Sequence, residues 1–213
     1  MAMETFKAGE IEREGYLVLP ESGHGKGILF LHAWWGLTDV FKEVCDRLAL
    51  EGFVVFAPDL HHGAILTTIQ EAEDYVMSRP VPPVMETAKA GMRFLQNHPA
   101  VEGDKLSAVA FSMGASFAYD LDAEFPDAFD KIVLVYGGPV DLTSVHAKFQ
   151  CHFGEDDFID PIEYVHEMDM GDAEVFYYPD TNHWFFEPNQ EGYYKPEEAE
   201  LAYQRMVRFF KES

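Results

Sequence analysis

Basic residues are scarce in this chain. It carries 15 lysines and arginines against 38 aspartates and glutamates, which gives a formal net charge of −23. Binding to nucleic acid requires clustered lysine and arginine, so the composition excludes nucleic acid as a partner. The same charge opposes anionic substrates, unless a local basic pocket overrides the field. We interpret most of the carboxylates as a solvated surface.

Long apolar runs are also missing. No stretch approaches the ~20 apolar residues that cross a bilayer, and Met1–Lys7 has no apolar region of a secretory signal. We therefore expect a cytoplasmic protein without a membrane partner. The two cysteines, Cys45 and Cys151, fall in an expected helix and an expected strand. Buried free thiols are the favoured interpretation, and a disulfide or a catalytic thiol is the alternative.

Internal repeats, low-complexity tracts and linkers are absent from the 213 residues, which predicts one domain over residues 1–213. Apolar runs expected as strands alternate with stretches expected as helices. The expected strands are Tyr16–Leu19, Gly27–Leu31, Phe53–Ala57, Leu106–Phe111, Lys131–Tyr136, Phe149–Phe153 and Ala173–Tyr178. The expected helices are Val40–Leu50, Thr67–Met77, Val84–Gln96, Met113–Phe125, Pro161–Met168 and Pro196–Phe210. This alternation predicts an α/β fold with a doubly wound, mostly parallel sheet flanked by helices. No insertion is long enough for a separate cap domain.

A serine stands between one of these strands and the following helix. Ala110-Phe111-Ser112-Met113-Gly114 places Ser112 in a tight turn with small residues two positions before and after it. Strand, serine and helix in this order form the nucleophile elbow of α/β-hydrolases, in which the hydroxyl is exposed above the sheet. The short motif is weak alone, and its position between strand and helix strengthens it.

An acid and a histidine follow in the chain order of such hydrolases. Asp157 comes after the strand that ends near Phe153, and His183 comes after the last strand. His183 would take the serine proton as general base, and Asp157 would orient the imidazole. Asp156, Asp160 and Asp141 compete with Asp157 for this role. The backbone N–H groups of Met113 and Trp34 are expected to form the oxyanion hole.

Together with other segments of the chain, these residues resemble the sequences of the dienelactone hydrolase family. The landmarks are His32-Ala33-Trp34-Trp35-Gly36-Leu37, Leu48–Phe53, Ala57–Leu60, Phe111–Ala115, Gly154–Asp157 and His183-Trp184-Phe185. The resemblance runs from about Tyr16 to the C-terminus. It implies an α/β-hydrolase fold without a large cap and a triad at Ser112, Asp157 and His183.

Two departures from the family pattern concern the nucleophile. The family's characteristic nucleophile is cysteine, and this chain has Ser112; where the family usually has a glutamate, it has Ala33. Both changes favour an ordinary serine esterase mechanism.

Two more departures concern substrate charge. The family implies arginines that hold a substrate carboxylate, at positions where this chain has Glu187 and the loop His61-His62-Gly63. An anionic dienelactone is therefore disfavoured as a substrate. The alternative is that Arg79, Arg93 or a lysine such as Lys195 folds back into the pocket and replaces the missing pair.

The sequence thus predicts a cofactor-independent serine hydrolase that cleaves a small ester, lactone or thioester through an acyl-enzyme. Trp34, Trp35, His61, Trp184 and Phe185 are the expected pocket walls. No metal is expected, because adjacent histidines at 61 and 62 point apart and a third ligand at a familiar spacing is missing. The alternative is a non-catalytic protein that binds a small molecule on a hydrolase scaffold.

Overall fold

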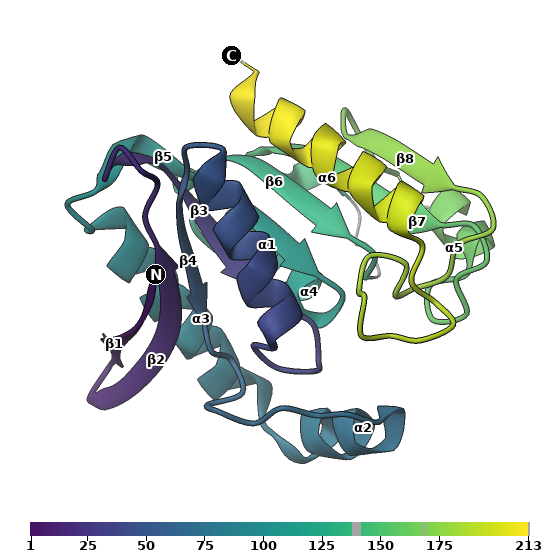
Figure 1. Ribbon diagram of the computed structural model, residues 1–213, viewed down its shortest axis with the longest axis horizontal. Helices are drawn as coiled ribbons and strands as arrows, with labels where there is room; N and C mark the ends of the chain where they lie inside the picture. Colours follow the sequence, from purple (N-terminus) through teal and green to yellow (C-terminus); the bar gives the residue numbers. More distant parts are fainter. Residues whose placement is uncertain (138–141, 168, 213) are drawn as a thin grey trace. The chain divides into compact units, whose positions relative to one another are not determined.

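The computed structural model describes residues 1–137, 142–167 and 169–212. The chain forms two compact units, residues 1–108 and residues 109–213, which are described separately below (Figure 1). Strand β5 (Val101–Phe111) begins in the first unit and ends in the second.

The first unit contains a sheet with the strand order β1-β2-β4-β3. Strands β1 (Ala2–Ala8) and β2 (Ile11–Val18) form an antiparallel hairpin, and β2 also pairs antiparallel with β4 (Val54–Pro58). Strand β3 (Gly25–Leu31) runs parallel to β4. Both β3 and β4 are almost wholly buried, as expected for apolar strands covered on both faces.

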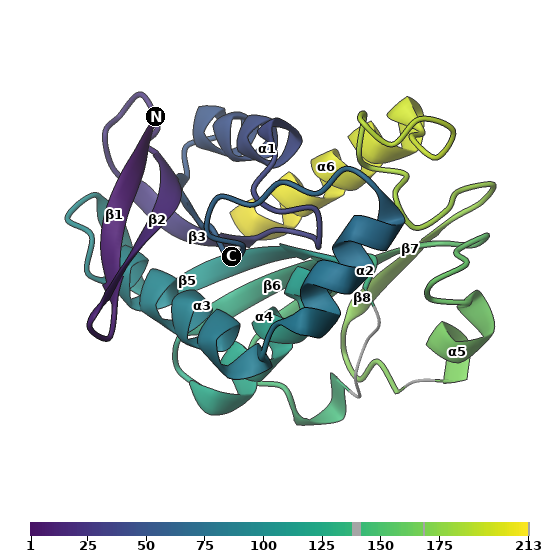
Figure 2. The same cartoon turned by 90° about the horizontal axis from the view of Figure 1, so that it is seen from below.

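Helices cover both faces of these strands. Helix α1 (Asp39–Leu50) packs on β4, and α3 (Val81–Gln96) packs on β1, β3 and β4 from the opposite side (Figure 2). The ring of Phe56 in β4 contacts those of Phe6 and Phe94, with centroids 5.4 and 4.6 Å apart. Helix α2 (Ile69–Ser78) begins with a capping box, in which Thr68 and Glu71 bond each other's backbone N–H groups.

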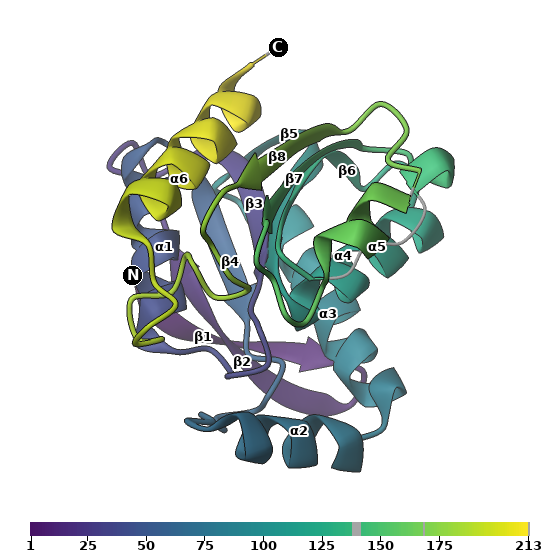
Figure 3. The same ribbon diagram turned by 90° about the vertical axis from the view of Figure 1, so that its right-hand side faces the viewer.

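The second unit contains three parallel strands in the order β6-β7-β8, which are Phe129–Val135, Lys148–Gly154 and Glu174–Tyr178. Helix α4 (Met113–Glu124) packs on β6, and α6 (Pro196–Lys211) packs on β6 and β7 from the other side (Figure 3). A 3₁₀ turn, η1 (Leu142–Ser144), and a short helix, α5 (Ile162–Glu167), complete the unit. The buried ammonium of Lys131 donates to the carbonyls of Phe209 and Glu212, which fixes the C-terminus of α6 on β6.

The seven expected strands and six expected helices are all present, with ends shifted by up to about five residues. Strand β1 was not expected. In addition, α3 begins at Val81, within the proline-rich segment predicted only to separate two helices, because proline is tolerated in the first turn of a helix. Cys45 and Cys151 are free and buried, as predicted. The single domain over residues 1–213 stays a prediction.

Among the described residues, no helix combines the length and apolar composition needed to cross a membrane.

Candidate functional site

The elbow at Ser112 has the strained backbone expected of a serine held at a sharp corner. Strand β5 ends at Phe111 and α4 begins at Met113, so one residue makes the turn. Ser112 has φ 50° and ψ −115°, a sparsely populated conformation for a residue with a side chain. Its N–H lies 3.1 and 3.2 Å from the carbonyl oxygens of Val135 and Tyr136 at the end of β6. These bonds hold the strained residue in place.

Gly137 allows this close approach. A Cβ atom at residue 137 would lie 2.4 Å from the carbonyl oxygen of Ser112, and Gly137 has φ 97°. Both the space and the backbone conformation therefore require glycine there.

A histidine lies within hydrogen-bond distance of the serine. Ser112 Oγ is 2.9 Å from Nε2 of His183, and the ring of His183 is fully buried. Nδ1 of the same ring lies 2.8 Å from Oδ2 of Asp157. A carboxylate only accepts, so Nδ1 carries the proton and Nε2 is free to accept from the serine hydroxyl. This arrangement is able to withdraw the serine proton during nucleophilic attack.

Asp157 is held rigidly in the loop after β7. Its Oδ1 accepts the backbone N–H groups of Ile159 and Asp160 at 2.8 and 2.9 Å, which leaves Oδ2 for the histidine. The three residues predicted as a triad are therefore brought together, and each follows the carboxyl end of a strand in the second unit.

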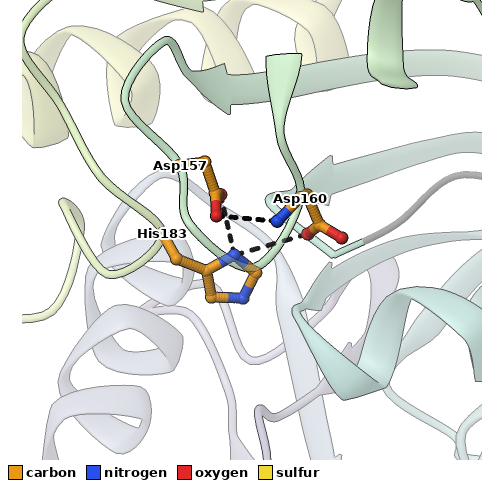
Figure 4. Close-up of side chains that lie close together, drawn as sticks. All are labelled: Asp157, Asp160 and His183. Atoms are coloured by element: carbon orange, nitrogen blue, oxygen red, sulfur yellow. Dashed lines mark hydrogen bonds and ion pairs between the residues drawn. The ribbon is translucent and has the colours of Figure 1, made fainter. Parts of the chain in front are cut away.

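The competing acids have different positions. The Asp156 residue is exposed, and its N–H donates to the carbonyl of Thr181. Asp141 lies outside the described residues. Asp160 is also close to the histidine, with Oδ2 3.3 Å from Nδ1 (Figure 4). Burial raises the pKa of Asp160, and the neighbouring Asp157 adds to the rise.

The expected oxyanion donors belong to different units. Met113 is the first residue of α4, where the leading N–H groups have no partner within the helix and face developing negative charge favourably. Trp34 lies in the first unit, with its ring 5.3 Å from that of Trp35.

The expected pocket walls are mostly buried. In the second unit, Trp184 packs its ring edge-on against His183, and Phe185 packs against Tyr136 and Tyr178. In the first unit, Trp35 and His61 are 1% and 2% exposed.

A buried glutamate behind the histidine is not evident as a site residue from the sequence. Glu187 is fully buried, and its Oε1 accepts from the hydroxyl of Tyr136 at 2.6 Å. The Tyr136 ring in turn lies 4.7 Å from the His183 ring. No described group bonds Oε2 of Glu187. Burial raises the pKa of Glu187 to about 8, so this carboxyl is mostly protonated at neutral pH.

An arginine does reach the loop in which none was evident from the sequence. The guanidinium of Arg79 lies 2.7 Å from Nδ1 of His62, 2.9 Å from the Tyr75 hydroxyl and 3.3 Å from the carbonyl of Leu60. The sequence could name Arg79 only as one of several basic residues able to fold back, because it comes from the end of α2, 17 residues beyond His62. These hydrogen bonds show that Arg79 stabilises the conformation of the loop.

Within the described part of the chain, one cluster has the residue types for a metal ion, namely Asp157, Asp160 and His183, with ligand atoms within 4.8 Å of one another. The Nδ1 atom of His183 already donates to Asp157. A metal on Nδ1 would move the proton to Nε2, which could then no longer accept from Ser112. The cluster therefore suits proton transfer better than metal binding.

The chain is similar to known proteins over nearly its whole length. The model of the dienelactone hydrolase family matches residues 13–213. Protein usf of Aquifex pyrophilus is 29% identical over 99% of this chain and 97% of its own length. Carboxymethylenebutenolidase of Rhodococcus opacus is 24% identical over 90% of this chain and 82% of its own length.

Solved structures confirm the predicted fold class, an α/β-hydrolase fold with a mostly parallel sheet flanked by helices. A dienelactone hydrolase-like promiscuous phosphotriesterase from metagenomic libraries superposes with a TM-score of 0.84, at 21% identity over 98% of this chain and 96% of that one. A dienelactone hydrolase homologue from Klebsiella pneumoniae subsp. pneumoniae also reaches 0.84, at 20% identity over 100% of this chain and 98% of that one. With the match over residues 13–213, the chain belongs to the dienelactone hydrolase family, a family of hydrolases.

Proposed function

We propose that this chain is a serine hydrolase that cleaves a small ester, lactone or thioester through an acyl-enzyme on Ser112. The observation that carries the proposal is the continuous relay from Ser112 Oγ through both nitrogens of His183 to Asp157, with successive distances of 2.9 and 2.8 Å. A serine hydroxyl is a poor nucleophile at neutral pH, and this relay supplies the base that activates it.

The reaction follows from the positions of the protons. Ser112 Oγ attacks the carbonyl carbon while its proton passes to Nε2 of His183, and Asp157 stabilises the imidazolium that forms. The N–H of Met113 binds the oxyanion. When the bond to the leaving group breaks, Nε2 returns the proton to the departing oxygen or sulfur. Water then attacks the acyl-enzyme by the same route and restores the serine.

We also propose that the substrate is neutral close to the scissile bond. The two positions at which the family resemblance implies carboxylate-binding arginines hold Glu187 and the loop 61–63, and the net charge is −23. Although Arg79 reaches that loop, its guanidinium is engaged by Leu60, Tyr75 and His62.

A panel of p-nitrophenyl esters, lactones and thioesters tests this function. Ser112→Ala should lower kcat on the best substrate on the order of 10⁴-fold or more, since single triad residues act as a unit. Ser116→Ala is the matched control, because Ser116 is an exposed serine in the first turn of the helix that follows Ser112, and it should retain wild-type kcat. Equal activity in all three proteins would refute the proposal, as would a wild-type protein that binds these substrates without cleaving them.

A further inference from the structure

The acid loop of the second unit brings a second carboxylate to the catalytic histidine. Strand β7 ends at Gly154, and Asp157 accepts two N–H bonds from the residues that follow, including that of Asp160. This turn folds the chain back, so that the carboxylate of Asp160 lies at the same ring nitrogen as that of Asp157 (Figure 4). The oxygen distances to Nδ1 of His183 are 2.8 Å for Asp157 and 3.3 Å for Asp160.

Asp160 is also fixed from a second side. The same oxygen, Oδ2, accepts the N–H of Gly137 at 2.9 Å. Gly137 is the residue whose missing side chain allows the close approach to the carbonyl of Ser112. Asp160 therefore connects the backbone that supports the nucleophile with the ring of the base.

The two carboxylates differ in their access to solvent. The side chain of Asp157 is fully buried, whereas that of Asp160 is 15% exposed. Solvent at Asp160 makes its ionised form easier to maintain than full burial would, although partial burial still raises its pKa. His183 is faced by both aspartates, by the hydroxyl of Ser112 and by the Tyr136 ring, behind which Glu187 lies.

On the basis of the proposed hydrolase function, we infer that Asp160 is a second acidic positioning residue, which helps Asp157 to hold His183 and to stabilise its imidazolium. When the serine proton moves to Nε2, the ring becomes positive with both carboxylates beside Nδ1, and both attract it. If Asp157 is neutralised, Asp160 is near enough to accept the Nδ1 proton in its place.

Four variants test this role on the best ester substrate: Asp157→Asn, Asp160→Asn, the double variant and Asp156→Asn. The last removes an exposed carboxylate of the same loop and is the control. Asparagine keeps an oxygen that can accept from Gly137, so Asp160→Asn removes charge with little change in shape. We expect Asp157→Asn to retain at least tenfold more kcat than the double variant. Asp160→Asn alone should lower kcat several-fold at unchanged KM.

The pH profile separates electrostatic support from a structural role. Without Asp160 the imidazolium of His183 loses one of its two negative neighbours, so the acid limb of the kcat/KM profile should move to lower pH in Asp160→Asn. It should not move in Asp156→Asn. This measurement needs only the Asp160→Asn protein, whatever the folding of the double variant.

The inference is overturned if the Asp160→Asn profile superimposes on the wild-type profile. It is also overturned if Asp157→Asn is as inactive as the double variant. Failure of the underlying function would look different, because Ser112→Ala would then match the wild type in hydrolysis.

Discussion

An aspartate and a histidine lie close together in each unit of this molecule, but the two histidines have different hydrogen-bond partners. In the first unit, Asp59 Oδ1 lies 3.8 Å from Nε2 of His32. Nε2 accepts the N–H of Leu60 at 3.0 Å, and Nδ1 lies 2.7 Å from the carbonyl oxygen of Ala33. Both ring nitrogens are therefore bound to backbone, and burial lowers the pKa of His32. This histidine is a neutral structural support.

The pair in the second unit has the same residue types, but the second nitrogen of its histidine faces a side chain instead of the backbone. His183 gives one nitrogen to Asp157 and presents the other to Ser112. In the first unit, the carboxylate of Asp59 accepts the N–H groups of His61 and Gly63. A buried Asp–His pair is therefore a candidate base only where the far nitrogen of the histidine faces a nucleophile.

Replacing each histidine by glutamine gives the largest expected effects and tests the different roles of His183 and His32. His183→Gln should lower kcat on the order of 10⁴-fold, because the base is lost. His32→Gln should instead lower the free energy of unfolding by about 2–3 kcal/mol, since buried polar groups left unpaired cost about 1–3 kcal/mol each, and should retain most of kcat. Ester hydrolysis and urea unfolding of both variants measure the two quantities. Interchanged effects would mean that the roles have been assigned to the wrong histidines.

Glu187 is a buried acid that has no basic partner among the described residues. Its pKa is raised to about 8 from 4.5. Between these values the folded chain holds a proton that the unfolded chain has released, so stability falls as the pH rises. At about 1.4 kcal/mol per pKa unit, the wild type should lose roughly 4–5 kcal/mol relative to Glu187→Gln between pH 4.5 and pH 8.5.

Urea unfolding of the wild type and of Glu187→Gln across that range measures this difference. The two proteins should be similar in stability at pH 4.5, and the variant should be the more stable one at pH 8.5. A difference that stays constant with pH would show that folding does not raise the pKa of Glu187.

The smallest expected effect concerns substrate charge and the braced arginine of the first unit. A neutral short-chain ester should have a kcat/KM at least about tenfold above that of its analogue with a free carboxylate, a factor that corresponds to ~1.4 kcal/mol. Arg79→Gln should leave this ratio unchanged, because the guanidinium is engaged by its own loop. A preference for the anionic ester that disappears in Arg79→Gln would instead make Arg79 a carboxylate-binding residue.

Most of the fold could be predicted because its inner strands are continuous apolar runs and its helices are amphipathic. Strand β1 could not be predicted from the sequence, because six of its seven residues are exposed or partly exposed and only Phe6 is buried. Its stability comes from pairing with β2, a non-local contact that leaves little trace in local composition.

The serine, the acid and the histidine of the site could be predicted from their order along the chain. Ser112 stands in a recognisable strand-to-helix turn, and the acid and the histidine follow strands in the expected order. The sequence could name Asp160 only as a rival to Asp157, because the turn that brings both carboxylates to one nitrogen depends on backbone bonds. Tyr136 gave no signal, and Glu187 was visible only as the residue in place of an implied arginine, since burial side by side arises from tertiary packing.

Covalent labelling tests the central claim most directly. A fluorophosphonate probe reacts with an activated serine, and peptide mass spectrometry locates the adduct. We predict one adduct in the wild type, on the peptide that contains Ser112, and none in Ser112→Ala, while His32→Gln still labels. An unlabelled wild-type protein, or an adduct that persists in Ser112→Ala, would contradict the assignment of Ser112 as the nucleophile.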